Sequence, residues 1–416
     1  MPLLTCEALT QAVHARSERA REWLMDLIRF PSTQGQEAPV MHYLRELCQG
    51  LGLPAELREI PEEIRQDPEY SHGEAEGPYA GRPNLICRLP GAGGGRSVIL
   101  QSHADVIPGG EWAEAFSPRW DGVFVHGRGA TDCKGSVVTA LLALAALRDL
   151  GVTLAGDLEL QLVIEEEPGG NGALALIRQG CTADGVVVVE ATGGNVYCAG
   201  RGALWFRLKT FGVSAHMGRR NEAVNAIEKM MEAMRLLLEY EQRLIAESRD
   251  HPLFRRYAAP VQVCLGMIHA GTWPSMIPEV CTLEGGVGFL PNKPMGRIRE
   301  ELVEVLNSTP DEWLRTHYEL THPKLHNDSY ELDPAHPLVT TTHQAALDCG
   351  LDSVAEGWNV SCDARLYARL AGLPTIVFGP SDIREAHATG EKIRWEEVLQ
   401  AAPALALAVA RWCGTD

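Results

Sequence analysis

The stretch LELQLVIEEEPGGNG, residues 158–172, joins an alternating strand pattern to three consecutive glutamates and a glycine-rich turn. Burying ionised carboxylates is costly unless cations or hydrogen-bond donors compensate them. No Lys or Arg stands beside the run in the sequence, so we expect another cation, and a metal ion is the simplest candidate. Adjacent side chains of extended backbone point to opposite faces. Neighbouring glutamates at a strand end can therefore serve different tasks.

Short apolar runs typical of buried strands alternate with helical patterns along the chain. The run Val186–Val189 does not alternate, which suits a sheet covered on both faces. Ser136–Leu150 is apolar almost all round and predicts a buried helix. This order indicates an α/β domain. The polar stretch of residues 61–83 is expected to be a surface loop. Further strands are predicted at Asn84–Arg88, Ser97–Gln101, Leu158–Ile164 and Thr375–Phe378, and helices at Ser17–Arg29 and about Val40–Leu51.

From about Gly202 the pattern changes to strand, helix, strand, strand, helix, a compact α+β unit. The chain has 416 residues, more than the roughly 250–300 at which a single core usually divides. We therefore predict a catalytic domain of residues 1–201 and 325–416 and an inserted domain of residues 202–324. A helix of the inserted domain is expected to carry one apolar stripe, formed by Val224, Ile227, Met230, Met231, Met234, Leu237 and Leu238.

The composition excludes several classes of protein. A net charge of -18 argues against nucleic-acid binding, which rests on Lys and Arg contacts to phosphates. No apolar stretch approaches the ~20 residues that span a bilayer, and the N-terminus lacks a signal pattern. The eleven cysteines show no framework spacing. We expect a cytoplasmic protein with reduced, mostly buried thiols.

Several potential metal ligands follow predicted strands. His103 and Asp105 follow the strand Ser97–Gln101, Glu190 ends Val186–Val189, and His387 comes shortly after Thr375–Phe378. Ligands bind beyond the carboxyl ends of strands in open α/β sheets. Asp132 lies in the glycine-rich segment Gly127–Gly135. Alternatives remain: a turn can satisfy His103 and Asp105, and Asp132 can cap the helix that follows.

These motifs resemble the dinuclear zinc amidohydrolases related to acetylornithine deacetylase, succinyl-diaminopimelate desuccinylase, aminoacylase and carboxypeptidase G. The resemblance covers nearly the whole chain in order. It rests on His103–Asp105, Gly127–Gly135, Glu165–Gly172, Glu190, Gly212–Gly218 and Ala386–Ala388. It implies a zinc-exopeptidase-like catalytic domain with a mixed, mostly parallel sheet, and an inserted ferredoxin-like lid or dimerisation domain.

The resemblance also implies the roles of individual residues. Asp132 would bridge two divalent metal ions, one held also by His103 and Glu190 and the other by Glu167 and His387. Glu166 would be the general base, and Asp105 would orient His103. His216 would stabilise the oxyanion from the lid of a partner subunit in a homodimer. Zn²⁺ is favoured, with Co²⁺ or Mn²⁺ as alternatives. The family usually has Asp where Glu165 stands, so the order of roles within the triplet depends on the glycines that follow.

The reaction implied is hydrolysis of the amide bond of a small-molecule N-acyl amino acid. A dipeptidase or exopeptidase with the same centre is the alternative. A non-catalytic metal-binding relative would lack the base or a ligand, and none is missing. The lid stretch Gly286–Pro291 has no arginine where relatives carry one for the substrate carboxylate. Arg365 and Asn225 are therefore the candidate substrate contacts, and Gly200–Gly202 supplies a further arginine.

Overall fold

The computed structural model describes residues 4–73 and 75–415, which form two compact units. Unit 1 contains the described residues up to Cys198, together with Leu332–Glu356 and those from Cys362 onward. Unit 2 contains Ala199–Glu331 and Gly357–Ser361. The division predicted from the sequence placed the boundaries at 201/202 and 324/325.

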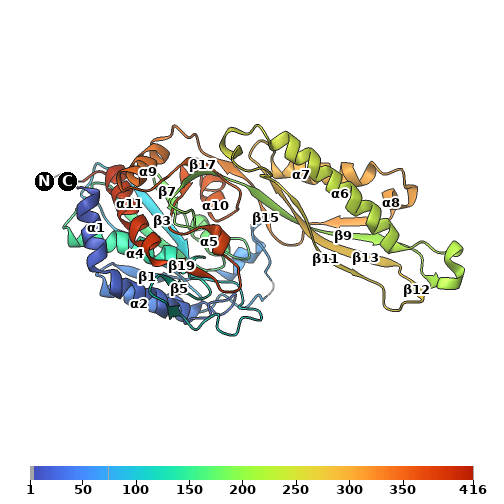
Figure 1. Ribbon diagram of the computed structural model, residues 1–416, viewed down its shortest axis with the longest axis horizontal. Helices are drawn as coiled ribbons and strands as arrows, with labels where there is room; N and C mark the ends of the chain where they lie inside the picture. Colours follow the sequence, from blue (N-terminus) through green and yellow to red (C-terminus); the bar gives the residue numbers. More distant parts are fainter. Residues whose placement is uncertain (1–3, 74, 416) are drawn as a thin grey trace. The chain divides into compact units, whose positions relative to one another are not determined.

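Unit 1 is built on a mixed β-sheet (Figure 1). Its four central strands, β6, β3, β7 and β18, are parallel, while β1, β2 and β8 are antiparallel to their neighbours. Every residue of β3 and of β7 is buried. Because alternate side chains point to opposite faces, both faces must be covered. In spatial order the strands are β1 (Ala55–Arg58), β2 (Asn84–Leu89), β6 (Leu158–Val163), β3 (Val98–His103), β7 (Val186–Val188), β18 (Thr375–Val377) and β8 (Val196–Gly200). The short strands β16 (Tyr330–Glu331) and β17 (Ala355–Trp358) also pair with β8.

The helices of unit 1 supply that cover. The predicted buried helix is α4 (Lys134–Asp149), whose residues from Lys134 to Leu147 are all buried. It packs against α11 (Trp395–Cys413), and both contact β3. The other helices are α1 (Cys6–Ala15), α2 (Ser17–Ile28), α3 (Ala38–Gly50), α5 (Asn171–Arg178), α9 (Pro337–Asp348) and α10 (Ala364–Arg369). A small sheet pairs β4 (Arg119–Trp120), β5 (Phe124–His126) and β19 (Lys392–Arg394).

The sequence suggested that residues 61–83 form a surface loop, but part of this segment is buried. Tyr70, Ser71, Tyr79 and Arg82 are all buried. The Tyr79 hydroxyl and the Arg82 guanidinium reach the carboxylate of Glu165. The polar composition of the segment therefore reflects buried hydrogen bonding as well as solvent exposure.

The expectation of reduced thiols is wrong for two cysteines. Cys6 of α1 and Cys349, which follows α9, form a disulfide. The two residues are 343 positions apart in the sequence. Sequence spacing cannot reveal such a pair, because only the packing of the helices brings the two sulfurs together.

Unit 2 is an antiparallel sheet with helices. The strand order is β11 (Val263–Ala270), β13 (Val280–Phe289), β9 (Gly202–Phe211) and β14 (Tyr318–Thr321). Alternate residues of β9 are buried, which is typical of a sheet covered on one face. Shorter strands are β10 (Ala215–His216), β12 (Met276–Ile277), β15 (His326–Asn327) and β16 (Tyr330–Glu331), and the helices are α6 (Ala226–Ser248), α7 (Met295–Asn307) and α8 (Glu312–Thr316).

The apolar stripe predicted for α6 divides into two parts. Met230 and Leu237 are buried, whereas Ile227, Met231 and Leu238 are exposed. The prediction of a single buried stripe is therefore wrong, because only some of its residues pack against the sheet. Among the described residues, no helix combines the length and the apolarity needed to cross a membrane.

Candidate metal centre and catalytic site

His103 is the last residue of β3, at the carboxyl edge of the sheet. Its Nδ1 lies 3.1 Å from the backbone oxygen of Asp105 and 3.3 Å from Asp105 Oδ1. Both partners accept hydrogen bonds, so Nδ1 carries a proton, and Nε2 is the ring nitrogen left to bind a metal ion. This is the arrangement that a metal-binding histidine needs.

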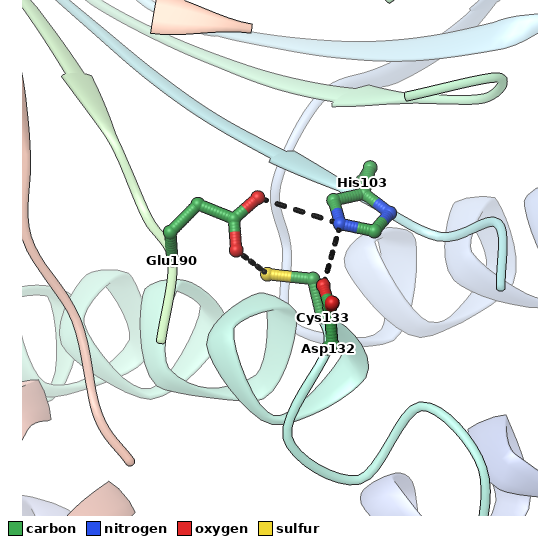
Figure 2. A group of neighbouring side chains, drawn as sticks. All are labelled: His103, Asp132, Cys133 and Glu190. Atoms are coloured by element: carbon green, nitrogen blue, oxygen red, sulfur yellow. Dashed lines mark hydrogen bonds and ion pairs between the residues drawn. The ribbon is translucent and has the colours of Figure 1, made fainter. Parts of the chain in front are cut away.

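His103 Nε2 points at a buried group of acidic side chains (Figure 2). Asp132 Oδ1 is 3.1 Å away and Glu190 Oε1 is 3.4 Å away. The Sγ of Cys133 lies 3.0 Å from the other oxygen of Glu190. Each of these four residues offers a ligand atom within 4.8 Å of the others. They come from the carboxyl ends of two strands and from the turn before α4.

A second group shares Asp132. Its Oδ2 is 3.3 Å from Nε2 of His387, which is in turn 2.9 Å from Glu167 Oε2. The two oxygens of one carboxylate thus face two different histidines. The His387 side chain is 52% exposed, whereas that of His103 is fully buried. This second group is therefore the side of the site that solvent reaches.

The donor set and its charge fit divalent cations. Asp132, Glu167 and Glu190 bring three carboxylates close to two imidazoles. Glu167 Oε1 is buried and has no hydrogen-bond partner among the described residues. Burial and the neighbouring Asp132 raise the pKa of Glu167 to about 7. Hydrogen bonds to Asp132 and Glu167 raise the pKa of His387 to about 11. The two carboxylates therefore favour a positive charge at this place. Imidazole and carboxylate ligands suit zinc and related ions.

The sequence suggested that the three glutamates lie in extended backbone, but they do not. They form a turn after β6, in which Glu165 has φ 57°, in the left-handed region. This conformation is uncommon for a residue with a Cβ and is typical of functional sites. The backbone N–H groups of Glu166 and Glu167 donate to Asp105 Oδ1 and Oδ2, at 3.2 and 3.1 Å. The turn, rather than strand alternation, separates the glutamate side chains.

Glu166 differs from Glu167 in its surroundings. It belongs to neither ligand group, and no hydrogen bond to the described residues restrains its carboxylate. Burial raises the pKa of Glu166, and the nearby Asp363 and Glu190 carboxylates add to the effect against the opposing His103. A carboxylate with a raised pKa beside a ligand group is suited to accept and return a proton.

Three further residues support the site and did not stand out in the sequence. Cys133 donates its thiol to Glu190. Glu391 accepts the backbone N–H groups of Thr131 and Asp132, at 2.9 and 3.1 Å. Burial raises the pKa of Asp363 to about 7, and its Oδ2 accepts a hydrogen bond from Gln101. Cys133 lies within the segment Gly127–Gly135, whereas Asp363 and Glu391 lie outside the motifs, and nothing in the residue types alone distinguishes the three from their neighbours.

The remaining candidates lie in different settings. Arg365 is buried and donates to the backbone oxygen of Gly169 at 3.0 Å, and it pairs with Glu69 at 3.4 Å. Asn225 caps α6 through a hydrogen bond from the N–H of Ile227. His216 is an exposed residue of β10 in unit 2. Arg201 of unit 2 donates to Gln262. The structure brings none of these four side chains into either ligand group.

The fold and the strand-edge site define a hydrolase of the metallopeptidase class, and comparison with known proteins agrees. Residues 99–411 match Peptidase family M20/M25/M40, so the chain belongs to that family. The membership and the α/β fold predicted from the sequence are confirmed.

The relatives differ in the activity that their names give. The chain is 28% identical to the N-formyl-4-amino-5-aminomethyl-2-methylpyrimidine deformylase of Bacillus subtilis (strain 168), over 80% of this chain and 84% of that protein. It is 24% identical to the acetylornithine deacetylase of Myxococcus xanthus, over 95% and 97%. Human carnosine dipeptidase 1 has the same fold, with a TM-score of 0.76 at 14% identity, over 99% of this chain and 100% of that chain.

Proposed function

We propose that the protein is a metal-dependent hydrolase that removes an acyl group from the nitrogen of a small molecule. The observation that carries this proposal is Asp132, whose two carboxylate oxygens face His103 and His387. Glu190 would complete one ion site and Glu167 the other. Two divalent ions, Zn²⁺ in the first place and Co²⁺ or Mn²⁺ as alternatives, would activate water and polarise the substrate carbonyl when bound.

The side chains of the site then have distinct tasks. Glu166 takes a proton from the attacking water and delivers it to the nitrogen of the leaving amine as the C–N bond breaks. Its raised pKa makes the protonated form accessible between these two steps. Asp105 holds the imidazole of His103 and the backbone of the glutamate turn in one arrangement. Ligands, base and orienting carboxylate are thus fixed relative to each other.

The substrate is proposed from two observations. Arg365 is buried and occupied by Gly169 and Glu69, so it is not available to bind a substrate carboxylate. The chain also aligns over most of its length with a deformylase that acts on an aminomethylpyrimidine. Both favour a formylated aminomethylpyrimidine as the substrate, and N-acyl amino acids form the second candidate class. Dipeptides are the third candidate class, because the chain shares only its fold with the dipeptidase.

A substrate panel tests the proposal. Metal-free protein is loaded with Zn²⁺ or Co²⁺ and assayed for amine release from the formylated aminomethylpyrimidine, N-acetyl and N-succinyl amino acids, and dipeptides. We expect hydrolysis of one acylated amine with kcat/KM of about 10⁴ M⁻¹s⁻¹ or more. Dipeptide cleavage alone would assign the alternative function. Zero turnover across the panel in fully loaded protein would refute the proposal.

We also propose that the protein is a homodimer through unit 2. Strand β11 is an edge strand whose sequence VCLGMIHA carries no Asp, Glu, Lys or Arg, and Met267 and Ile268 on it are about half exposed. Unprotected apolar edges pair with other chains. The neighbouring α6 presents Ile227, Met231 and Leu238 to solvent at helical spacing. Strand pairing with a second copy would cover both features.

The role proposed for His216 depends on this dimer and has its own test. Glu166→Gln and His216→Ala proteins, each inactive alone, are unfolded together, refolded and assayed. If His216 acts on the site of the other subunit, heterodimers contain one complete site, and about a quarter of wild-type activity returns. No return of activity in a mixture that contains heterodimers would show that His216 does not act across subunits.

A further inference from the structure

A buried charged network lies behind the glutamate turn. The Arg82 guanidinium donates through Nε and Nη2 to the two oxygens of Glu37, both at 2.7 Å. The same Nη2 donates to Glu165 Oε1 at 2.5 Å. The three side chains are between 0% and 6% exposed. One guanidinium therefore joins the residue preceding α3 to the first glutamate of the triplet.

The second oxygen of Glu165 is held as firmly. Tyr79 Oη donates to Glu165 Oε2 at 2.6 Å, and Asn171 Nδ2 donates to the same oxygen at 2.9 Å. The backbone oxygen of Glu165 accepts from the N–H groups of Gly170 and Asn171, at 2.9 and 3.0 Å. Every oxygen of Glu165 is thus engaged. Such saturation can hold a residue in the left-handed region that its own preference disfavours.

Glu165 is followed directly by the proposed base and the proposed ligand. The N–H groups of Glu166 and Glu167 donate to the carboxylate of Asp105. The side-chain contacts of Glu165 and the carboxylate of Asp105 therefore hold the turn at three consecutive residues. A change in the backbone of Glu165 would move the carboxylates of both following residues.

We propose that Arg82 is a positioning residue, which fixes the glutamate turn through Glu165 so that Glu166 and Glu167 are held in their working places. This rests on the proposed function of the site. Arginine suits the task because its planar fork can engage two carboxylates at once, whereas a lysine ammonium has neither the geometry nor the reach. Glutamate suits position 165 because aspartate is one methylene shorter and would withdraw from Arg82.

The test uses two conservative variants and a matched control. Arg82→Lys keeps the charge and removes the fork, and Glu165→Asp keeps the carboxylate and shortens it. Arg178→Lys changes another arginine on the same region, since Arg178 of α5 pairs with Asp67 of the segment 61–83 at 2.6 Å. That pair is partly exposed and touches none of the three glutamates. All proteins are compared as folded, metal-loaded samples.

We expect Arg82→Lys and Glu165→Asp to lower kcat by about 10- to 100-fold with KM within about two-fold of wild type. We expect weaker binding at the site that contains Glu167, measured by calorimetry with Zn²⁺ alone. Arg178→Lys should match the wild type in both measurements. Because arginine removal can impair folding, Arg82→Ala is assayed with added guanidinium ion, which should restore part of kcat.

The proposal is overturned if kcat per folded, metal-loaded molecule and Zn²⁺ affinity are unchanged in both conservative variants. Equal losses in Arg178→Lys would assign Arg82 to general stability of the segment instead. Failure of the proposed function has a different signature, because the wild type would then be inactive on every substrate. The Zn²⁺ titration would still test the position of Glu167 in that case.

Discussion

Replacing Glu166 by Gln exchanges one carboxylate oxygen for an NH2 group and leaves the size of the side chain nearly unchanged. The Glu166 carboxylate makes no hydrogen bond to the described residues, and its backbone N–H contact to Asp105 is unaffected by the exchange. The folded structure therefore loses no hydrogen bond, and because burial disfavours the charged form of Glu166, we expect no loss of stability from the exchange. The catalytic site, however, loses the only group that we assign to proton transfer.

The size of the effect follows from that role. General acid–base catalysis contributes about 10²- to 10⁴-fold, which corresponds to roughly 3–5 kcal/mol of transition-state stabilisation. We expect kcat to fall by this factor while both metal ions remain bound. Glu167→Gln is the matched contrast, because Glu167 Oε2 lies 2.9 Å from His387 and Oε1 is buried without a partner. That variant should lose one metal equivalent.

The assay combines kcat with metal content by elemental analysis, after dialysis against a fixed free Zn²⁺ concentration. Two equivalents in Glu166→Gln and one in Glu167→Gln would agree with the assignment. The opposite pattern would mean that the two neighbours have exchanged roles. Retention of more than about a tenth of wild-type kcat in Glu166→Gln is too small a loss for a general base and would refute the reasoning.

Three further perturbations test other parts of the structure. Asp105→Asn removes the negative charge that faces His103 Nδ1 and the N–H groups of Glu166 and Glu167. We expect kcat or Zn²⁺ affinity to fall about 10- to 100-fold. Unchanged values would contradict the orienting role of Asp105. Chelation of the metals leaves three carboxylates without cations. At a metal concentration of 100 times Kd the stability lost is about 2.7 kcal/mol for each ion removed, seen as a lower Tm, and an identical Tm would argue against binding. Cys6→Ser opens the Cys6–Cys349 disulfide and should lower unfolding stability by about 2–4 kcal/mol in denaturant titrations. Reduced wild type should match this variant, and a difference between the two would contradict the disulfide as the cause.

The elements that carry the site could be predicted because their signals are local. Strands β3 and β7 are buried throughout; β7 is a continuous apolar run, and β3 begins with one. Parallel strands align their carboxyl ends, so residues such as His103 and Glu190 that follow separate strands were expected to gather at one edge. The structure places them together, with Nε2 and Oε1 3.4 Å apart. The ligand roles themselves remain a proposal.

The backbone of the triplet could not be predicted from the same pattern. Strand alternation suggested that neighbouring glutamates point to opposite faces, but β6 ends at Val163 and Glu165 takes a left-handed conformation. A single residue of unusual φ leaves no periodic trace in the sequence. Contacts from the distant residues Tyr79 and Arg82, together with the nearby Asn171, make that conformation stable.

The sequence by itself determined the class of fold, the family and the set of ionisable residues at the strand ends, because these follow from residue type and local order. It also indicated that the glutamate run needs compensation by positive charge. The tertiary structure decided how that compensation is divided. Arg82, 83 positions before Glu165 in the chain, pairs with the first glutamate, and Glu167 belongs to a candidate metal-ligand group. It likewise decided the contacts between Cys133 and Glu190 and between Cys6 and Cys349. Such pairings join residues far apart in the chain, and only packing fixes them.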